Sequence, residues 1–423
     1  MLPADNQPLR TRRNVGSKGR ALQSEQWEFD GTAPDPERLA ESVRPLVERL
    51  RQRIAGSGPI TFAEFMSAAL YDPDHGYYRR AERRPGRGGD FLTAPEATPL
   101  FGITLARQIA ECWERLGSPE RFTIREYGAG IGGLAYDILA GLSEASPAAF
   151  EAVDYRLVDV NETQLAGALD AMSEVGLGRK VSAELADEST LEPITGVVLA
   201  NEVADAIPVH RLIMTDAGVR ERLVGWSDGW FADVVGPLSD TARAAAESIA
   251  NQIEFEPGDL FEVAPAAAEW FAGAADSLER GFALIIDYGY EMDELYAPSR
   301  RTGLVRGYAA HTVTDDPYRR VGEQDLTAHV DFTALARAGE SAGLALAGLT
   351  TQADLLVALG LGEFMVEMQR DPEMTMDRYL AAQAAVLRLI DPGGLGRFRV
   401  LAMARNAPTD HPLRGFTPVH GLF

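Results

Sequence analysis

Residues 125–133 read Arg125-Glu126-Tyr127-Gly128-Ala129-Gly130-Ile131-Gly132-Gly133 and continue a run, begun at Phe122, that is typical of a buried strand. Glycine permits a positive φ and lets a ligand come close to the backbone. A helix is predicted from Leu134 to Leu142, and its first turn offers free N–H groups. The order of strand, glycine-rich turn and helix predicts a cofactor-binding unit, with a plain tight turn as the structural alternative.

Two acidic residues favour one class of cofactor. Gly128, Gly130 and Gly133 match the dinucleotide pattern G-x-G-x-x-G. Glu126 precedes them, where it would repel a pyrophosphate but attract the ammonium of a methionine moiety. Asp159 ends the second predicted strand, where a carboxylate accepts ribose hydroxyls, but it comes later than the roughly 20 residues expected after a dinucleotide loop. The pattern therefore favours S-adenosyl-L-methionine, bound by Glu126, Gly128, Gly130 and Asp159.

Outward from this loop, strands alternate with helices, which predicts a mostly parallel sheet. Strands are predicted at 122–127, 155–160, 181–185, 196–200 and 282–286. A helix at 331–342 then leads to a strand pair at 344–350 and 397–404. The predicted fold class is α/β, with the Rossmann-like core of a class I S-adenosylmethionine methyltransferase and an antiparallel last strand.

The chain divides into five segments on these signals. Residues 1–35 are polar and lack periodicity, which predicts a disordered tail. An N-terminal helical region with a cofactor-covering loop is expected at 36–120, and the methyltransferase core at 121–350. The expected additions are a β-hairpin insertion at 209–235, a helical insertion at 351–395, and the last core strand with a tail at 396–423.

Composition limits the partners of this chain. It has 423 residues with a formal net charge of -23, which disfavours nucleic acid and favours a cationic partner. Its single cysteine, Cys112, excludes an intrachain disulfide. No apolar run would span a membrane and no signal-peptide pattern begins the chain, so a cytoplasmic location is expected. The basic start between Arg10 and Arg20 leaves a mitochondrial transit peptide as the alternative, and the oligomeric state stays open.

Several blocks of sequence together resemble the MidA family of methyltransferases, which includes a mitochondrial complex I assembly factor that dimethylates arginine in a partner protein. The matching blocks lie at 58–66, 70–78, 89–96, 99–102, 125–133, 200–209, 287–290 and 322–333. The resemblance implies S-adenosyl-L-methionine as cofactor and a cationic protein or peptide as acceptor. It also implies that the segment with Thr93, Pro95 and Glu96 lies against the cofactor.

The end of the fourth predicted strand carries the candidate catalytic groups. Ligands of open α/β sheets lie beyond the carboxyl ends of the strands, so Asn201 and Glu202 should face the cofactor and its methyl group. Asp205 lies on the same turn. Carboxylates can hold a guanidinium and concentrate electron density on one nitrogen. The alternative is that Glu202 and Asp205 only cap the following helix.

A second polar cluster consists of Glu323, Asp325, His329 and Asp331, which the resemblance places near the substrate entrance. His329 is a candidate general base because its ordinary pKa lies near neutrality, while Thr327 is a candidate helix cap in a purely structural alternative. The six histidines lack the spacing of metal ligands, so no metal site is expected.

The chain departs from the family pattern at two places. Val203-Ala204 replaces a usual aromatic pair, and Ala183 replaces a usual tryptophan, so a wider pocket beside the cofactor is expected. Four functions are compatible with the sequence. Protein arginine N-methylation leads, followed by methylation of a small molecule or peptide natural product, a cofactor-binding assembly chaperone, and last a dehydrogenase.

Overall fold

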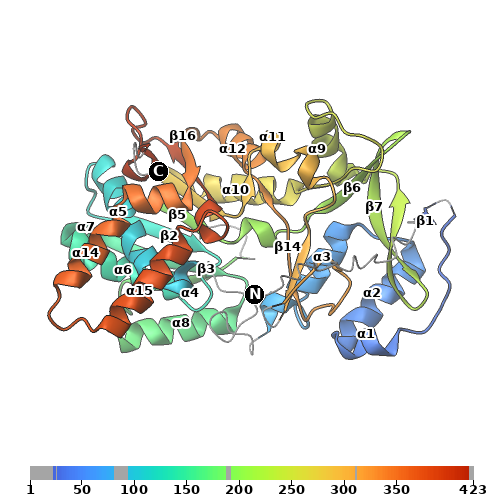
Figure 1. Ribbon diagram of the computed structural model, residues 1–423, viewed down its shortest axis with the longest axis horizontal. Helices are drawn as coiled ribbons and strands as arrows, with labels where there is room; N and C mark the ends of the chain where they lie inside the picture. The colour runs from blue at the N-terminus through green and yellow to red at the C-terminus, as the bar shows by residue number, and fades with distance from the viewer. Residues whose placement is uncertain (1–21, 25, 81–93, 187–191, 310–311, 419–423) are drawn as a thin grey trace, which may run out of the picture.

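The computed structural model describes residues 22–24, 26–80, 94–186, 192–309 and 312–418. Its centre is a sheet with the strand order β16-β17-β10-β5-β2-β3-β4 (Figure 1). The strands are β2 (Phe122–Tyr127), β3 (Val153–Asp159), β4 (Val181–Leu185), β5 (Ile194–Asn201), β10 (Leu278–Asp287), β16 (Ala345–Thr351) and β17 (Arg399–Arg405). The strands from β10 to β4 run parallel, whereas β17 is antiparallel to both neighbours. The predicted α/β fold class with an antiparallel last strand is confirmed.

The central strands are apolar along most of their length because helices cover both faces of the sheet. Helices α5 (Leu100–Arg115), α6 (Gly133–Ala145) and α13 (Gln352–Ala358) share one hydrophobic cluster with the first face. Helices α10 (Pro265–Asp276) and α12 (Phe332–Ser341) pack on the other face. The remaining helices of the core are α7 (Pro147–Ala152) and α8 (Glu162–Glu174). This packing fixes the carboxyl ends of the parallel strands at one edge of the sheet.

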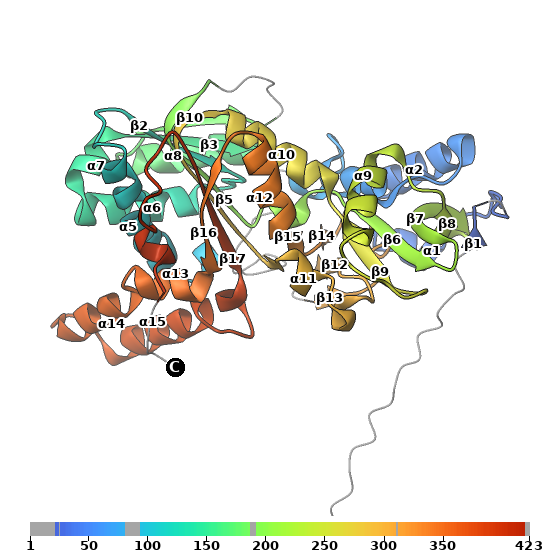
Figure 2. The same cartoon turned by 90° about the horizontal axis from the view of Figure 1, so that it is seen from above.

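A second sheet lies beside the core, with the strand order β1-β8-β7-β6-β9 (Figure 2). Its strands are β1 (Leu22–Gln23), β6 (His210–Thr215), β7 (Gly218–Ser227), β8 (Trp230–Gly236) and β9 (Leu260–Val263). Helices α2 (Arg44–Ser57) and α3 (Phe62–Tyr71), which follow α1 (Pro36–Ala40), form a cluster with β7 and β8 around Phe65, Trp226 and Phe231. Helix α9 (Asp240–Ala250) packs against β6 and β9.

Three expected boundaries differ from this arrangement. The hairpin expected at 209–235 is the middle of the second sheet and does not join the edge of the core sheet. The tail expected over 1–35 is ordered in its last part, because β1 pairs parallel with β8, while residues 1–21 lie outside the described residues. The region 36–120 is also split, since α3 packs on the second sheet and α5 on the core. Periodicity reveals a buried face but does not reveal which sheet buries it.

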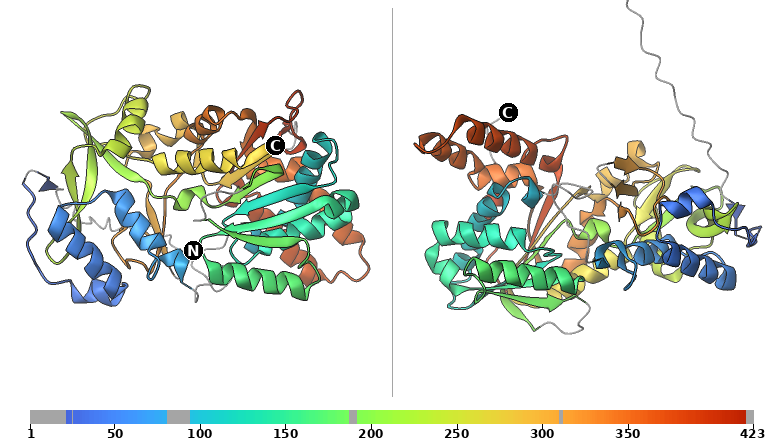
Figure 3. Two further views of the ribbon diagram at one scale, coloured as in Figure 1. Left: turned by 180° about the vertical axis from the view of Figure 1, so that it is seen from behind. Right: turned by 90° about the horizontal axis from the view of Figure 1, so that it is seen from below.

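Smaller elements complete the molecule, whose two lobes lie side by side in both views of Figure 3. Short strands are β11 (Gly289–Tyr290), β12 (Arg306–Ala309), β13 (Thr312–Thr314), β14 (Asp325–Thr327) and β15 (Val330–Asp331). Short helices are α4 (Ala94–Ala97), α11 (Met292–Leu295), η1 (Tyr77–Arg79), η2 (Ala204–Ala206), η3 (Pro298–Arg300), η4 (Leu395–Arg397) and η5 (Arg414–Phe416). Helices α14 (Leu361–Arg370) and α15 (Met376–Leu389) occupy the predicted helical insertion. Within the described ranges, no helix is long and apolar enough to cross a lipid bilayer.

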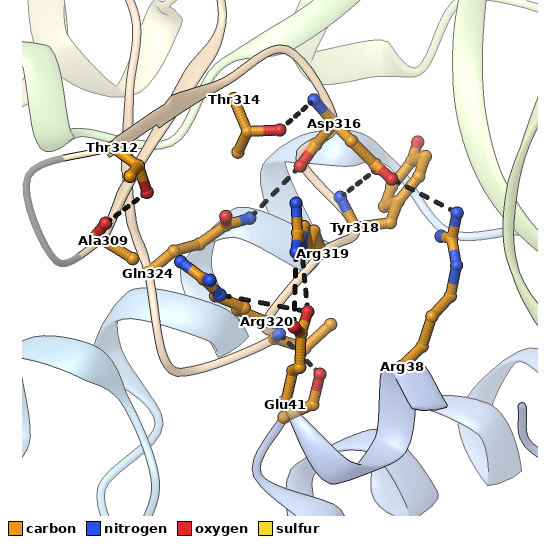
Figure 4. A network of polar contacts seen from close by, with 12 residues as sticks. Arg38, Glu41, Ala309, Thr312, Thr314, Asp316, Tyr318, Arg319, Arg320 and Gln324 are labelled. Atoms are coloured by element: carbon orange, nitrogen blue, oxygen red, sulfur yellow. Dashed lines mark hydrogen bonds and ion pairs between the residues drawn. The ribbon is translucent and has the colours of Figure 1, made fainter. Parts of the chain in front are cut away.

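A polar network ties the three-stranded sheet β13-β12-β14 to the N-terminal helices (Figure 4). The guanidinium of Arg319 donates to Glu41 at 2.9 Å, and Arg38 pairs with Asp316 at 3.4 Å. The buried side chain of Gln324 donates to the carbonyl of Pro317 at 2.9 Å. The charged pairs join the two parts but are exposed and contribute only about 0–1 kcal/mol each, whereas the buried amide of Gln324 braces the segment 317–324 itself. The network fixes the segment that begins β14 at Asp325.

Candidate functional site

A large cavity opens at the carboxyl ends of β2, β3, β5 and β10. Its volume is about 1350 Å³, which exceeds the roughly 300–1,000 Å³ of an ordinary ligand pocket. Gly128, Asp159, Glu202 and Tyr288, which line it, each stand at the end of one of these strands. The cavity therefore has room for a cofactor and an acceptor group together.

The glycine-rich loop presents its backbone to this cavity. Gly128 and Gly130 both line the cavity and have φ values of 69° and 52°, which L side chains rarely adopt. A Cβ at Gly128 would lie 2.6 Å from Cγ2 of Val203, so no side chain fits there without a shift. Gly132, with φ 78°, then begins α6. The loop is thus a cradle for a ligand that contacts the main chain.

Asp159 completes the wall on the side of β3. Its Oδ2 accepts the N–H of Gly130 at 2.9 Å, and its Oδ1 accepts the N–H of Asn161 at 2.9 Å. Burial raises the pKa of Asp159, although these hydrogen bonds oppose the rise. Each carboxylate oxygen can accept two hydrogen bonds, so both oxygens can still accept one from a ribose hydroxyl. Asp159 therefore fixes the loop and can still hold a ribose.

Glu126 lies under the same loop and is only 3% exposed. The hydroxyl of Tyr155 donates to its Oε2 at 2.7 Å. Burial raises the pKa of Glu126 to about 8, although this hydrogen bond opposes the rise. A cation brought to the cavity would favour its ionised form. The position fits the role expected of Glu126, attracting an ammonium group.

Asn201 and Glu202 end β5 and face the cavity. Oε1 of Glu202 accepts the N–H of Ala94 and the side-chain amide of Asn201, each at 3.1 Å. Burial raises the pKa of Glu202 to about 8, and its backbone is left-handed, with φ 55°. Oδ1 of Asn201 is buried and has no hydrogen-bond partner among the described residues. This pair therefore offers an unused acceptor atom and a carboxyl group held in an unusual backbone conformation.

Asp205 lies on the next turn and is 8% exposed. It does not cap this turn, because Oδ2 of Asp287 accepts the N–H groups of Val203, Ala204 and Asp205 at 2.9–3.2 Å. Burial, followed by the charge of Asp287, raises the pKa of Asp205 well above its usual range. Burial also raises the pKa of Asp287, but the backbone N–H groups that donate to it oppose this rise. A proton shared by Asp205 and Asp287 therefore resides mainly on Asp205. The residue that caps the turn is Asp287, which was not predicted from the sequence.

The opposite wall combines aromatic rings with a third carboxyl group. The hydroxyl of Tyr78 donates to Oδ1 of Asp325 at 2.8 Å, and that of Tyr71 to the carbonyl of Ala206 at 3.1 Å. The rings of Tyr71 and Tyr78 stack with centroids 5.6 Å apart. Both rings belong to the hydrophobic cluster of the second sheet and also line the cavity. They position Asp325, which sequence reasoning grouped with His329.

The predicted cluster of Glu323, Asp325, His329 and Asp331 does not form one group. Asp325 and His329 line the cavity, but Glu323 pairs with Arg80, and Asp331 caps α12 by accepting the N–H of Ala334. Asp331, not Thr327, is therefore the cap of this segment. Thr327 instead accepts the hydroxyl of Tyr288.

His329 is poorly suited to take up a proton. Burial, followed by the charges of Arg397 and Arg306, lowers the pKa of His329 to about 4. Its Nδ1 is buried and has no partner among the described residues. The ring stacks on Tyr290 with centroids 5.5 Å apart. The imidazole is therefore neutral near pH 7 and held in place by aromatic contacts.

Other predicted positions have mixed outcomes. Pro95 lines the cavity but belongs to the short helix α4, and Thr93 lies outside the described residues. Val203 lines the cavity, as the departure from the family pattern implies, whereas Ala204 is buried in the core. Among the described residues, no group of His, Cys, Asp or Glu is arranged to hold a metal ion.

The sheet with its antiparallel β17, the loop after β2 and the carboxylate ending β3 are the features of an S-adenosylmethionine-dependent methyltransferase. A family model of S-adenosyl-L-methionine-dependent methyltransferases matches residues 104–350, and the chain belongs to this family. It is therefore an enzyme whose cofactor is S-adenosyl-L-methionine, which removes the dehydrogenase alternative.

Individual relatives cover nearly the whole chain. The chain is 30% identical to the mitochondrial protein arginine methyltransferase NDUFAF7 of Xenopus tropicalis, over 89% of this chain and 90% of that protein. It is 28% identical to the homologue of Drosophila melanogaster, over 96% and 95% of the two chains. A superfamily member from Burkholderia thailandensis, solved with S-adenosyl-homocysteine bound, has a TM-score of 0.81 at 33% identity and covers 91% of this chain and 97% of that one. The family resemblance noted in the sequence is confirmed.

The residues present fit this cofactor. The unpartnered Oδ1 of Asn201 and the carboxyl of Glu126 suit an ammonium group, and the carboxyl of Asp159 suits ribose hydroxyls. The backbone at Gly128 is open to the cavity, where a Cβ would be blocked by Val203. These residues lie at the ends of the adjacent strands β5, β2 and β3, which are about 4.8 Å apart.

Proposed function

We propose that this chain methylates the guanidinium of arginine in a protein partner. The observation that carries the proposal is the convergence of Glu202, Asp205 and Asp325 on one cavity beside the cofactor site. Burial is the first cause that raises the pKa values of Glu202 and Asp205, and neighbouring carboxyl groups raise them further. Such a group of buried acids is relieved by a cation, and a guanidinium matches carboxylates bidentately. The names of the curated relatives support the same acceptor.

Glu202 is the residue proposed to hold and deprotonate the acceptor. When bound, S-adenosyl-L-methionine supplies an activated methyl group. Entry of a guanidinium lowers the pKa of Glu202 and ionises it, so that its carboxylate orients one nitrogen toward the cofactor site. That nitrogen would take the methyl group of the cofactor, which would leave as S-adenosyl-homocysteine, and the methylated nitrogen would lose one proton, which Glu202 would accept. A pKa near 8 before binding suits this exchange near neutral pH.

Asp205 and Asp325 are proposed to hold the far side of the guanidinium. Asp325 is positioned by Tyr78, and Asp205 by the turn that Asp287 caps. The rings of Tyr71 and Tyr78 form an apolar wall on that side of the cavity. His329, with its lowered pKa, is assigned a positioning role in place of the general-base role considered from the sequence.

Labelling tests the class of acceptor. Purified protein is incubated with radiolabelled cofactor and host lysate, which is then separated into protein and small-molecule fractions. We expect label in protein, and methylarginine after acid hydrolysis. Label found only in small molecules would contradict the proposal, and the large cavity with Val203 in place of an aromatic residue makes that the second candidate function. Cofactor binding without any transfer would favour the chaperone alternative.

Glu202→Gln tests the carboxylate, because it keeps the size of the side chain and removes its charge. We expect turnover to fall about 10²- to 10⁴-fold, or about 3–5 kcal/mol of transition-state stabilisation. Affinity for S-adenosyl-homocysteine should change little. Glu279→Gln, an exposed residue at the opposite end of the same sheet, is the matched control. Near-normal turnover in Glu202→Gln would argue for a neutral hydroxyl acceptor.

The cytoplasmic location expected from the sequence stays a prediction. The names of the curated relatives include the word mitochondrial, and the basic segment from Arg10 to Arg20 lies outside the described residues. Cell fractionation with an antibody against this chain distinguishes the two locations.

A further inference from the structure

The cavity has a second polar end that the proposed chemistry does not use. Arg306 at the start of β12, His329 between β14 and β15, and Arg397 in η4 line it together. We call these three residues the basic end. They come from three separate segments, and η4 leads directly into β17. The basic end therefore lies on the side of the core sheet that is farther from the cofactor site.

Part of the positive charge at this end has no ion-pair partner among the described residues. Arg397 has no ion-pair partner among the described residues, and the partner of Arg306, Asp315, is 86% exposed. The charges of Arg397, Arg306 and Arg300 all disfavour protonation of His329. The whole chain carries a net charge of -23 and acidic groups line the rest of the cavity, so the unpaired Arg397 is opposite in charge to its wider surroundings. An anion entering from solvent would be stabilised there.

The position of the basic end separates it from the cofactor contacts. In the sheet order, β17 lies three strands away from β2, which at about 4.8 Å per strand is about 14 Å. The cofactor contacts are at β2 and β3 and at Asn201, which ends β5 two strands away from β17, and the acidic groups Glu202 and Asp205 follow β5. Tyr308 also lines the cavity, where burial followed by the charge of Asp205 raises its pKa, while the charges of Arg306 and Arg397 oppose the rise. The order across the cavity is thus cofactor site, acidic groups and basic end.

We propose that the basic end binds a carboxylate of the acceptor, so that the enzyme selects an arginine with an acidic side chain or chain terminus close to it in space. This inference rests on the proposed function and adds the substrate class. Arg397 and Arg306 would hold the carboxylate while the carboxyl groups of Glu202 and Asp205 hold the guanidinium. An acceptor with both charges would be fixed at two points, which orients the nitrogen to be methylated. The other source of a carboxylate, the methionine moiety of the cofactor, is separated by the test below.

The test uses short synthetic peptides with a central arginine, in which each flanking position in turn is Glu or Gln. Binding to the complex with S-adenosyl-homocysteine is measured by calorimetry for wild type, Arg397→Met and Arg397→Lys. We expect wild type to prefer Glu over Gln at one position by about tenfold, or about 1.4 kcal/mol. Arg397→Met should lose this preference, and Arg397→Lys should keep part of it. Arg378→Met, an exposed arginine at the start of α15, is the matched control.

Two outcomes overturn the basic end as an acceptor subsite. One is equal affinity for every Glu and Gln pair, including the case in which no peptide binds. The other is a loss of affinity for S-adenosyl-homocysteine in Arg397→Met, which would assign the arginine to the cofactor. Methyl transfer to the same peptides is measured in parallel. Peptides that bind with the Glu preference but receive no methyl group would contradict arginine methylation and leave the subsite standing.

Discussion

Two regions follow neighbouring strands and face the same cavity, the loop at 128–133 and the turn at 201–205. They differ in the chemical groups that they present to the cavity. The loop offers backbone, and its glycines adopt conformations that exclude side chains. The turn offers carboxyl groups, whose protonation is set by burial and by one another. A larger side chain should therefore disable the loop, and the loss of a carboxylate charge should disable the turn. The two failures are distinguishable because one removes cofactor binding and the other removes turnover.

The largest expected effect comes from adding volume to the loop. Gly128→Val places a branched side chain where Val203 already lies and where φ is 69°. We expect affinity for S-adenosyl-homocysteine to fall at least 100-fold, or about 2.7 kcal/mol, while the fold persists in circular dichroism. Gly362→Ala, an exposed residue of α14 where a Cβ meets nothing within 4 Å, is the control. Unchanged affinity in Gly128→Val would remove this site assignment, and so would unchanged affinity in Asp159→Ala.

An intermediate loss of stability is expected when Asp287, the buried acid that caps the turn, is replaced. The carboxylate of Asp287 accepts the backbone N–H groups of Val203, Ala204, Asp205 and Tyr288. Asp287→Asn replaces one of its two acceptor oxygens by an NH2 group, which can only donate. Hydrogen bonds to charged groups contribute about 1.5–3 kcal/mol each, so we expect the free energy of unfolding in urea to fall by about that amount. Cofactor affinity should fall less than in Gly128→Val. Asp276→Asn, at an exposed residue that pairs with Arg405, is the control, and equal stability of the two variants would exclude Asp287 as the organiser of the turn.

The smallest effect is the pH dependence that Glu202 gives to turnover. Because the active form of Glu202 is the carboxylate and its pKa is about 8, kcat/KM should rise with pH and level off above about 8. Below that value the rise is about tenfold per pH unit. The same raised pKa means that the stability contributed by protonated Glu202 is lost as pH rises from its ordinary value of 4.5 towards 8. Affinity for S-adenosyl-homocysteine measured over the same range reports the titration of Glu126, whose pKa is also raised to about 8, and so separates the cofactor site from the turn. An unchanged pH profile of turnover in Glu202→Gln would exclude Glu202 as the titrating group.

The core and the cofactor residues could be predicted because their signals are local. The strands expected at 122–127 and 181–185 coincide with β2 and β4. A glycine run after a strand, or a carboxylate at a strand end, constrains the chain within a few residues. The cofactor that these features predicted is the cofactor of the family to which the chain belongs.

The acceptor side could not be predicted because it forms only when distant segments meet. Asp287 caps a turn more than 80 residues earlier in the chain, and Tyr78 positions Asp325 from the second sheet. Arg306 and Arg397 occupy sequence contexts that are ordinary for surface arginines, and only the cavity brings them together. The same limit explains the hairpin expected at 209–235, since alternation identifies strands but not the sheet they join.

The left-handed backbone of Glu202 has a consequence for the evolution and engineering of this enzyme. A residue other than glycine costs about 1–2 kcal/mol in this conformation, so glycine would be the more stable choice at φ 55°. A search for thermostable variants that scores folding alone would therefore tend to replace the residue proposed to hold the acceptor. Selection for activity and selection for stability oppose each other at this position. Libraries made to stabilise the protein should keep Glu202 fixed and seek their gains elsewhere.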